Sequence, residues 1–155
     1  IYSAGDLTID TGSLTLASSG NIIDNNATGI ISSDGALALN VTNSFTNYGW
    51  INGVESVSVS TDGTLYNRNT VNSDNTTSVY AKAGIYNYND IVAGNTLNVT
   101  SAGAINNTGT MFTEGKASVS AKTVSSLGSS AVFGGRQGLN LNVNSITYSG
   151  KVFGL

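Results

Sequence analysis

The chain has 155 residues, enough for one domain with a sizeable core, but its composition is not that of an ordinary globular domain. Charged residues make up 10% of the sequence, against about 25% in a typical domain. The net charge of -3 and the six scattered basic residues argue against a nucleic-acid interface and against charge-driven binding to an anionic membrane. Proline, cysteine and histidine are absent, which excludes Ser-His and Cys-His nucleophiles and ordinary zinc sites, so we expect no enzyme, no metal and no cofactor.

The first forty residues already alternate apolar and polar side chains, as a β-strand does. Leu37–Leu39 is the clearest early strand signal, and we expect Leu14–Leu16 to be its equivalent one repeat earlier. Ile23–Asn25 has an apolar-x-Asn spacing that recurs further along the chain. Ile1 begins within this pattern rather than in a signal peptide, so we expect the sequence to be an internal piece of a longer protein.

An internal period of about 20 residues dominates the centre of the chain. Three sets of apolar residues keep this same period, and strand-like alternation runs between them. The three columns are Phe45, Leu65, Ile85 and Ile105, then Ile51, Val71, Ile91 and Met111, and then Val59, Val79, Val99 and Val119. Such short units cannot bury their own apolar face, but they can when each coils once and stacks on the next. The sequence therefore predicts an all-β fold, a parallel β-helix with rungs of about 20 residues.

An asparagine follows each member of the first column by two positions. These residues are Asn47, Asn67, Asn87 and Asn107. Because alternate residues of a strand point to the same side, the asparagines should point inward and stack as a ladder of side-chain amides. Each buried amide would find its hydrogen-bond partner in the identical amide one rung away.

Aromatic residues give the one local binding signal, which we call the aromatic strip. The strip consists of Tyr48, Trp50, Tyr66, Arg68, Tyr86 and Tyr88. Strand alternation predicts that Tyr66 and Tyr86 point outward on adjacent rungs, with Arg68 between tyrosines in a second outward column. Two interpretations stay open: an exposed surface suited to sugar rings or protein contact, and a ladder that only stabilises the sheet.

The periodicity weakens between residues 125 and 138, where Gly134, Gly135 and Arg136 occur together. We expect this stretch to be an irregular loop inserted at one corner. Strand alternation resumes at Leu139–Val143 and continues through Ile146 and Val152. The sequence thus predicts a single repeat domain over residues 1–155.

The nine carboxylates are candidates for catalysis, because polysaccharide-active β-helices cluster such groups on neighbouring rungs. Asp34, Asp74 and Glu114 share a turn column, but alternate rungs lie too far apart for paired acid/base chemistry. The alternatives to a structural or adhesive filament are a β-helical polysaccharide-active enzyme or tailspike, and the passenger of an autotransporter adhesin. A cleft with three clustered carboxylates would favour the enzyme, and a translocator barrel in the flanking sequence would mark the autotransporter.

Three stretches, Ala4–Ile9, Ser44–Gly49 and Gly94–Gly109, carry a family resemblance. They resemble the repeats of filamentous haemagglutinin and of the related contact-dependent growth inhibition effectors, whose units read Gly-x-Leu-x-Leu-x-Ala-Gly-x-Ile-x-Asn-x-Gly. The likeness covers nearly the whole chain. The sequence lacks the Asn-Pro motifs of that family's amino-terminal secretion domain, because it contains no proline.

The resemblance implies a right-handed β-helical filament on the bacterial cell surface, secreted through an outer-membrane partner by two-partner secretion. Its implied partners are a receptor or glycan on a host or target cell, with adhesion, toxin display or recognition of a target bacterium as its roles. We also expect weak end-to-end self-association of the segment, since the end rungs of a cut β-helix carry unpaired strand edges.

Overall fold

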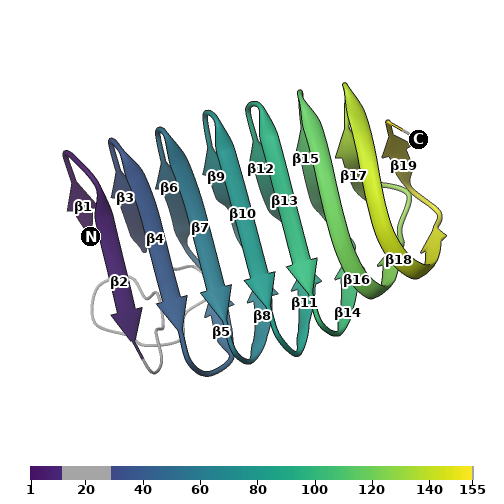
Figure 1. Ribbon diagram of the computed structural model, residues 1–155, viewed down its shortest axis with the longest axis horizontal. Coiled ribbons are helices and arrows are strands. Elements are labelled where there is room, and N and C mark those ends of the chain that lie inside the picture. Colours follow the sequence, from purple (N-terminus) through teal and green to yellow (C-terminus); the bar gives the residue numbers. More distant parts are fainter. Residues whose placement is uncertain (12–28, 155) are drawn as a thin grey trace.

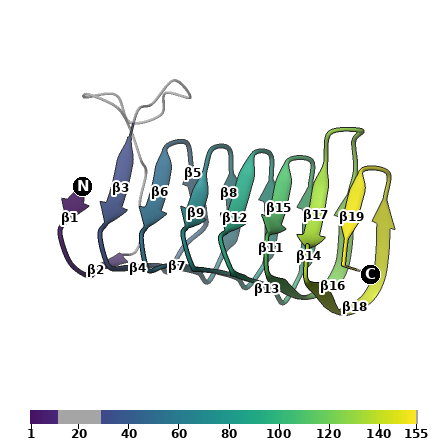
Figure 2. The same ribbon diagram turned by 90° about the horizontal axis from the view of Figure 1, so that it is seen from above.

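The computed structural model describes residues 1–11 and 29–154. All regular secondary structure in these residues is β-strand, and no helix among them is long and apolar enough to cross a membrane. The strands coil into a rod whose axis follows the sequence, with the first residues at one end and the last at the other (Figure 1). Every strand pairing is parallel, and the view from above shows successive rungs stacked side by side (Figure 2). The predicted class, an all-β parallel β-helix with the predicted rung length, is confirmed.

Each rung contributes one strand to an eight-stranded sheet, which we call the first sheet. Its strands, in spatial order, are β1 (Tyr2–Ser3), β3 (Ile30–Ser33), β6 (Trp50–Gly53), β9 (Val71–Ser73), β12 (Asp90–Ala93), β15 (Thr110–Thr113), β17 (Val132–Gly135) and β19 (Lys151–Phe153).

The rest of each rung forms two further stacks, which we call the second and third stacks. The second stack consists of β2 (Leu7–Thr11), β4 (Ala36–Val41), β7 (Ser56–Thr61), β10 (Thr76–Ala81) and β13 (Thr96–Ser101), followed by the first halves of β16 (Lys116–Ser126) and β18 (Gly138–Tyr148). The third stack consists of β5 (Phe45–Asn47), β8 (Thr64–Asn67), β11 (Gly84–Asn87) and β14 (Ala104–Asn107), followed by the second halves of β16 and β18. Because β16 continues around the corner, it pairs with both β13 and β14 and joins the two stacks into one eleven-stranded sheet.

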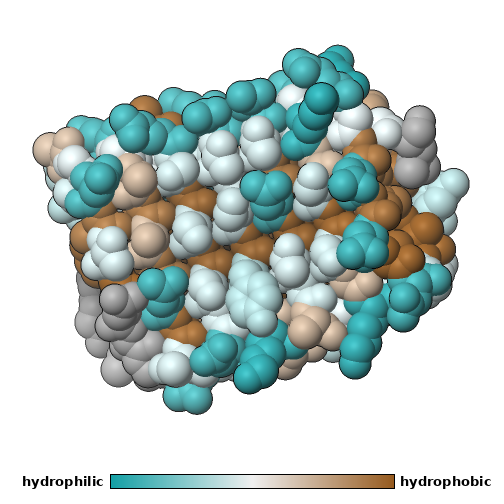
Figure 3. Space-filling view, in the orientation of Figure 1, coloured by the Kyte–Doolittle hydropathy of each residue, from teal (hydrophilic) through white to brown (hydrophobic). Residues whose placement is uncertain are grey.

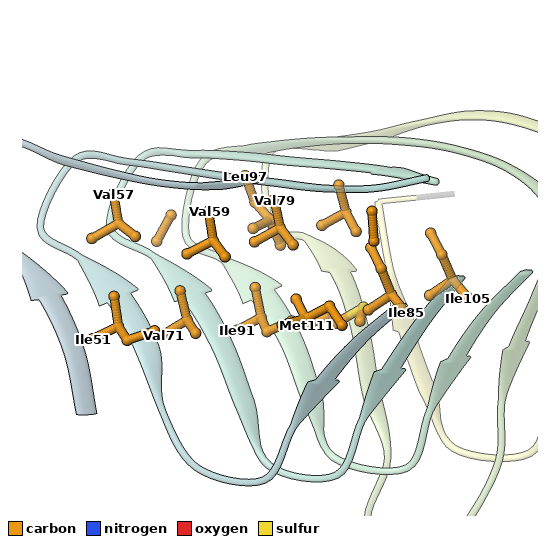
Figure 4. Close-up of a cluster of buried hydrophobic side chains, with 14 of the residues drawn as sticks. Ile51, Val57, Val59, Val71, Val79, Ile85, Ile91, Leu97, Ile105 and Met111 are labelled. Carbon is orange, nitrogen blue, oxygen red and sulfur yellow. The ribbon is translucent and has the colours of Figure 1, made fainter. Parts of the chain in front are cut away.

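The core is the stacked interior of this coil, and the three apolar columns run along it. Their members are 0% to 2% exposed. Figure 4 shows the row Ile51, Val71, Ile91 and Met111 on the first sheet, facing Val57, Val59 and Val79 across the interior. Burying such a side chain is worth about 1.5–3 kcal/mol, so the repetition of one column supplies the stability that no single rung has.

The outer face of the second stack carries small polar residues. Ser58, Ser78 and Asn98 are register neighbours on this face, alternating along their strands with buried valine and leucine. Figure 3 shows rows of weakly hydrophilic residues running along the rod between bands of apolar residues. The alternation of valine or leucine with serine, threonine or asparagine thus determines which side of each strand faces water.

The register step is constant through the centre of the chain and changes at both ends. Leu37 pairs with Leu7, which lies further back in the sequence than the central step would place it. The expectation that Leu14–Leu16 precedes Leu37–Leu39 is therefore wrong, because Leu7 and Ile9 occupy those register positions. Leu14–Leu16 and Ile23–Asn25 themselves lie outside the described residues.

The expected irregular loop over residues 125–138 is much shorter in the structure. Ser125 and Ser126 complete β16, and β17 occupies positions 132–135. Phe133 pairs with Met111 and is fully buried, so it continues an apolar column after a slightly longer step than the central one. The residues added in this rung lie in the corner between Ser126 and Val132. Phe133 still stacks on Met111, so the longer corner leaves the apolar column intact.

Candidate binding surface

Two tyrosine rings of the aromatic strip stack on the outer face of the third stack. Tyr66 lies on β8 and Tyr86 on β11, and parallel pairing places the two residues opposite each other. Their ring centroids are 5.2 Å apart and the ring planes differ by 17°. Buried Leu65 and Asn67 flank Tyr66 along the chain, so Tyr66 must point outward. A stacked pair of this kind adds about 0.5–1.5 kcal/mol beyond the area that it buries.

Arg68 occupies the neighbouring outward column, with a tyrosine ring on either side along the rod. The central carbon of its guanidinium lies 4.7 Å from the ring centroid of Tyr88 and 5.9 Å from that of Tyr48. Both distances are within the range of about 6 Å over which a cation is attracted to an aromatic face. Arg68 remains exposed, so the guanidinium is held in place while its N–H groups stay accessible.

Trp50 is separated from the other five residues of the aromatic strip by a corner of the rod. It is the first residue of β6 on the first sheet, two positions after Tyr48, and its side chain is 55% exposed. Among the residues that the structure describes, no ring contact joins Trp50 to the strip. The structure therefore brings together the stacked pair and the Tyr48-Arg68-Tyr88 group, with Trp50 beside them around the corner.

The four asparagines lie buried at that same corner, which joins the third stack to the first sheet of the next rung. They are at most 1% exposed. The side-chain amide nitrogen of Asn47 donates to the side-chain oxygen of Asn67 over 2.8 Å, and the pairs Asn67–Asn87 and Asn87–Asn107 repeat this bond at the same distance. No buried side-chain nitrogen or oxygen in the described residues lacks a hydrogen-bond partner.

Each amide of the ladder also holds the next corner in register. The amide nitrogen of Asn67 donates to the backbone carbonyl of Asp90 over 3.0 Å, and that of Asn107 donates to Val132 over 2.9 Å. The ladder ends at Ser126, whose hydroxyl accepts a 3.1 Å hydrogen bond from Asn107. The amides thus tie the end of each third-stack strand to the start of a first-sheet strand further along the rod.

Charged groups are sparse around the strip. Within the described part of the chain the one ion pair is Arg136 with Glu114, at 2.5 Å, and both side chains are mostly exposed. Exposed pairs of this kind contribute about 0–1 kcal/mol. Arg68 has no carboxylate within ion-pair distance among the described residues, so its positive charge is not neutralised by a partner and is stabilised by the two tyrosine rings.

The carboxylates of the shared turn column are not clustered. Val54 lies between Asp34 and Asp74 in the register, and Gly94 lies between Asp74 and Glu114. Asp34 accepts a 2.6 Å hydrogen bond from the hydroxyl of Tyr2, and this bond raises the pKa of that exposed phenol. Among the described residues no group of three carboxylates could hold a metal ion.

Comparison with known proteins places the chain in a family. The family model described as haemagglutinin repeat matches three times, over residues 2–69, 68–109 and 113–154. The chain belongs to the haemagglutinin repeat family. No curated protein and no solved structure matches it. The second match spans two rungs of the haemagglutinin repeat segment, from the corner after Asn67 to the corner after Asn107.

Four corner hydroxyls of the haemagglutinin repeat segment were not singled out from its sequence. They belong to the buried residues Ser33, Thr61, Ser101 and Thr113, and each accepts a hydrogen bond of 3.1–3.2 Å from the backbone N–H of the glycine two positions later. The signal was present as the spacing Ser/Thr-x-Gly at residues 33–35, 61–63, 101–103 and 113–115. These hydroxyls do at two corners of the rung what the asparagines do at the third, satisfying backbone groups where the chain turns.

A shallow depression on the second stack was also not predicted. Its volume is about 190 Å³, and it lies between rows of small residues with Tyr80 at one side. Tyr80 is 38% exposed, close to the 37% of Tyr86, but belongs to β10 rather than to the third stack. Tyr80 therefore gives an outward tyrosine of equal exposure that lies apart from the aromatic strip.

Proposed function

We propose that this haemagglutinin repeat segment is part of a filament of a large secreted bacterial surface protein, and that the aromatic strip is where it contacts another cell. Secretion through an outer-membrane partner and display at the cell surface are parts of this proposal. The partner is a receptor or glycan on a host cell or a target bacterium. The haemagglutinin repeat is a structural, adhesin-type repeat, so we assign the segment no enzymatic activity.

The observation that supports a filament is the uniform parallel stacking. The four rungs that contain Ile51, Val71, Ile91 and Met111 repeat at a constant step, and the ladder of amides fixes their register. A solenoid of this kind gains stability from each added rung, so it can extend without a globular core.

The aromatic strip supports a contact because it gathers aromatic side chains and one cation on adjacent rungs. Trp50, Tyr86 and Tyr88 are 37% to 55% exposed. Tryptophan, tyrosine and arginine are the residue types that most often dominate binding energy at interfaces. Five of the six residues are also held in place by ring contacts, so little side-chain entropy remains to be lost on binding.

A cell-binding assay with matched variants tests this proposal. Fluorescent beads carrying the wild-type segment would be applied to epithelial and bacterial cells, beside beads carrying the triple variant Tyr66→Ser, Tyr86→Ser, Tyr88→Ser. The control variant is Tyr80→Ser, which removes an equally exposed tyrosine from another face.

We expect the triple variant to lose most of the binding and the control to keep it, with both variants folded by circular dichroism. Equal binding of the folded triple variant would show that the strip is not the contact. If wild-type beads bind no cell, the segment is a spacer and the adhesive part of the proposal is wrong.

A further inference from the structure

The ring contacts within the aromatic strip restrict what it can offer a ligand. Tyr66 and Tyr86 cover one face of each other, and Tyr48 and Tyr88 lie against the guanidinium of Arg68. One face of each stacked ring is therefore already covered inside the strip. What the strip presents to solvent is the exposed guanidinium of Arg68, with the partly exposed rings of Tyr86 and Tyr88 beside it.

A guanidinium in this state is suited to one anionic group. Its planar fork forms two parallel hydrogen bonds with a carboxylate, and these are about twice as strong as hydrogen bonds between neutral groups. In the described residues no carboxylate forms an ion pair with Arg68, and the tyrosine rings already hold the side chain in place.

The charge around Arg68 argues against a dense polyanion. Eight of the nine acidic residues lie before residue 91, and Arg68 and Lys82 are the two basic residues in that part of the sequence. Because the rod follows the sequence, Arg68 is an isolated cation in a negatively charged half of the segment. A single carboxylate can approach it, while a chain with a charge on every unit would be repelled by the net negative charge of this half.

Trp50 supplies the second element of the site. It lies around the corner from Tyr48, has no ring contact with the strip, and is more than half exposed. An indole face of this kind packs well against the C–H face of a pyranose, and an exposed tryptophan commonly marks a binding site.

We propose that Arg68 binds a carboxylated sugar, a pyranose that carries one carboxylate at the end of an otherwise neutral glycan, and that Trp50 contacts the same glycan around the corner. Arg68 holds the carboxylate, Trp50 packs against a neighbouring sugar unit, and Tyr88 keeps the guanidinium in position. This inference rests on the proposed adhesive function and names the class of ligand for it. Glycans ending in sialic acid and glycans ending in glucuronic acid share this chemistry.

Calorimetric titration of the whole segment tests the inference. The probes are sialyllactose, a glucuronate-terminated oligosaccharide, the carboxyl methyl esters of both, and heparin as the polyanion. Trp50 is the single tryptophan of the chain, so its fluorescence reports contact at the site directly.

We expect at least one acidic probe to bind and to shift Trp50 emission, with its methyl ester and heparin binding much more weakly. Arg68→Gln should weaken the binding roughly tenfold or more, because a charge-assisted hydrogen-bonded pair is lost. Arg68→Lys should fall between the two, since it keeps the charge and loses the planar fork. The control variant Lys82→Gln removes a cation outside the strip and should bind as the wild type does.

The inference is overturned if neither acidic probe binds, if Arg68→Gln binds as tightly as the wild type, or if heparin binds best. None of these three results would contradict the adhesive function, which is tested separately by the cell-binding assay. Loss of cell binding in the tyrosine variant without any sugar binding would keep the contact surface and replace only its ligand.

Discussion

Two ladders run side by side on the same strands of the third stack, one inside the rod and one outside. On β8, Asn67 is buried and bonds to asparagines on both neighbouring rungs, while Tyr66 faces out and stacks on Tyr86. The inner ladder repeats asparagine on four successive rungs, whereas the outer one has tyrosine on two. The inner ladder must be complete, because an unpaired amide away from water costs free energy. The outer ladder can be interrupted, as it is by Asn106 on the rung after Tyr86, since water replaces a missing neighbour.

The largest expected effect comes from comparing two adjacent asparagines, Asn107 inside the rod and Asn106 outside it. Asn107→Ala removes the bonds to Asn87, Ser126 and the carbonyl of Val132, and should lower the free energy of unfolding by about 2–4 kcal/mol. Asn106→Ala, on the outward half-buried side of the same strand, should change it by about 0.5 kcal/mol or less. Urea unfolding followed by circular dichroism measures both, and equal losses would contradict the distinction between the two ladders.

The sequence predicted the inner ladder better than the outer contacts, and the reason is physical. Inward positions such as Asn87 and Ile85 are fixed by the alternation of a strand and a constant rung length. The contacts of Arg68 with Tyr48 and Tyr88 depend on side-chain rotamers, which periodicity leaves open.

Periodicity also failed where the rung length changed. Val124 and Phe133 belong to the apolar columns, but a shortened step before Val124 and a lengthened step before Phe133 hid them from the central period. Gly134, directly after Phe133, has a φ of 120°, and the carbonyl of Phe153 occupies the space that a side chain would need. The rings of Phe112 and Phe153 meet edge to face at 5.3 Å across that rung, a contact two repeats apart that no column indicated.

The next test concerns the end of the inner ladder, where a hydroxyl replaces the amide. Ser126→Ala removes the acceptor of one N–H of Asn107 and should cost about 1–2 kcal/mol, because that donor stays buried without a partner. Ser125→Ala is the matched outward change on the same strand and should be nearly neutral. Urea unfolding followed by circular dichroism measures the free energy of unfolding of both variants. A neutral Ser126→Ala variant would mean that Asn107 is satisfied by Val132 alone and that the ladder stops one rung earlier.

The smallest expected effect is on the outer ladder itself, measured as the coupling between Tyr66 and Tyr86. A double-mutant cycle with Tyr66→Ser and Tyr86→Ser removes each ring singly and then both, which isolates the stacking from other losses. We expect a coupling of about 0.5–1.5 kcal/mol, the usual value for an aromatic pair at this separation. The control cycle pairs Tyr66→Ser with Tyr80→Ser, whose residues lie on different stacks, and should show no coupling.

A coupling near zero in the first cycle would mean that stacking adds little stability, and the two tyrosines would then be explained by binding rather than by stability. A coupling above the expected range would instead make the stacked pair primarily a structural ladder, and the contact with a partner would then rest on Arg68, Tyr88 and Trp50.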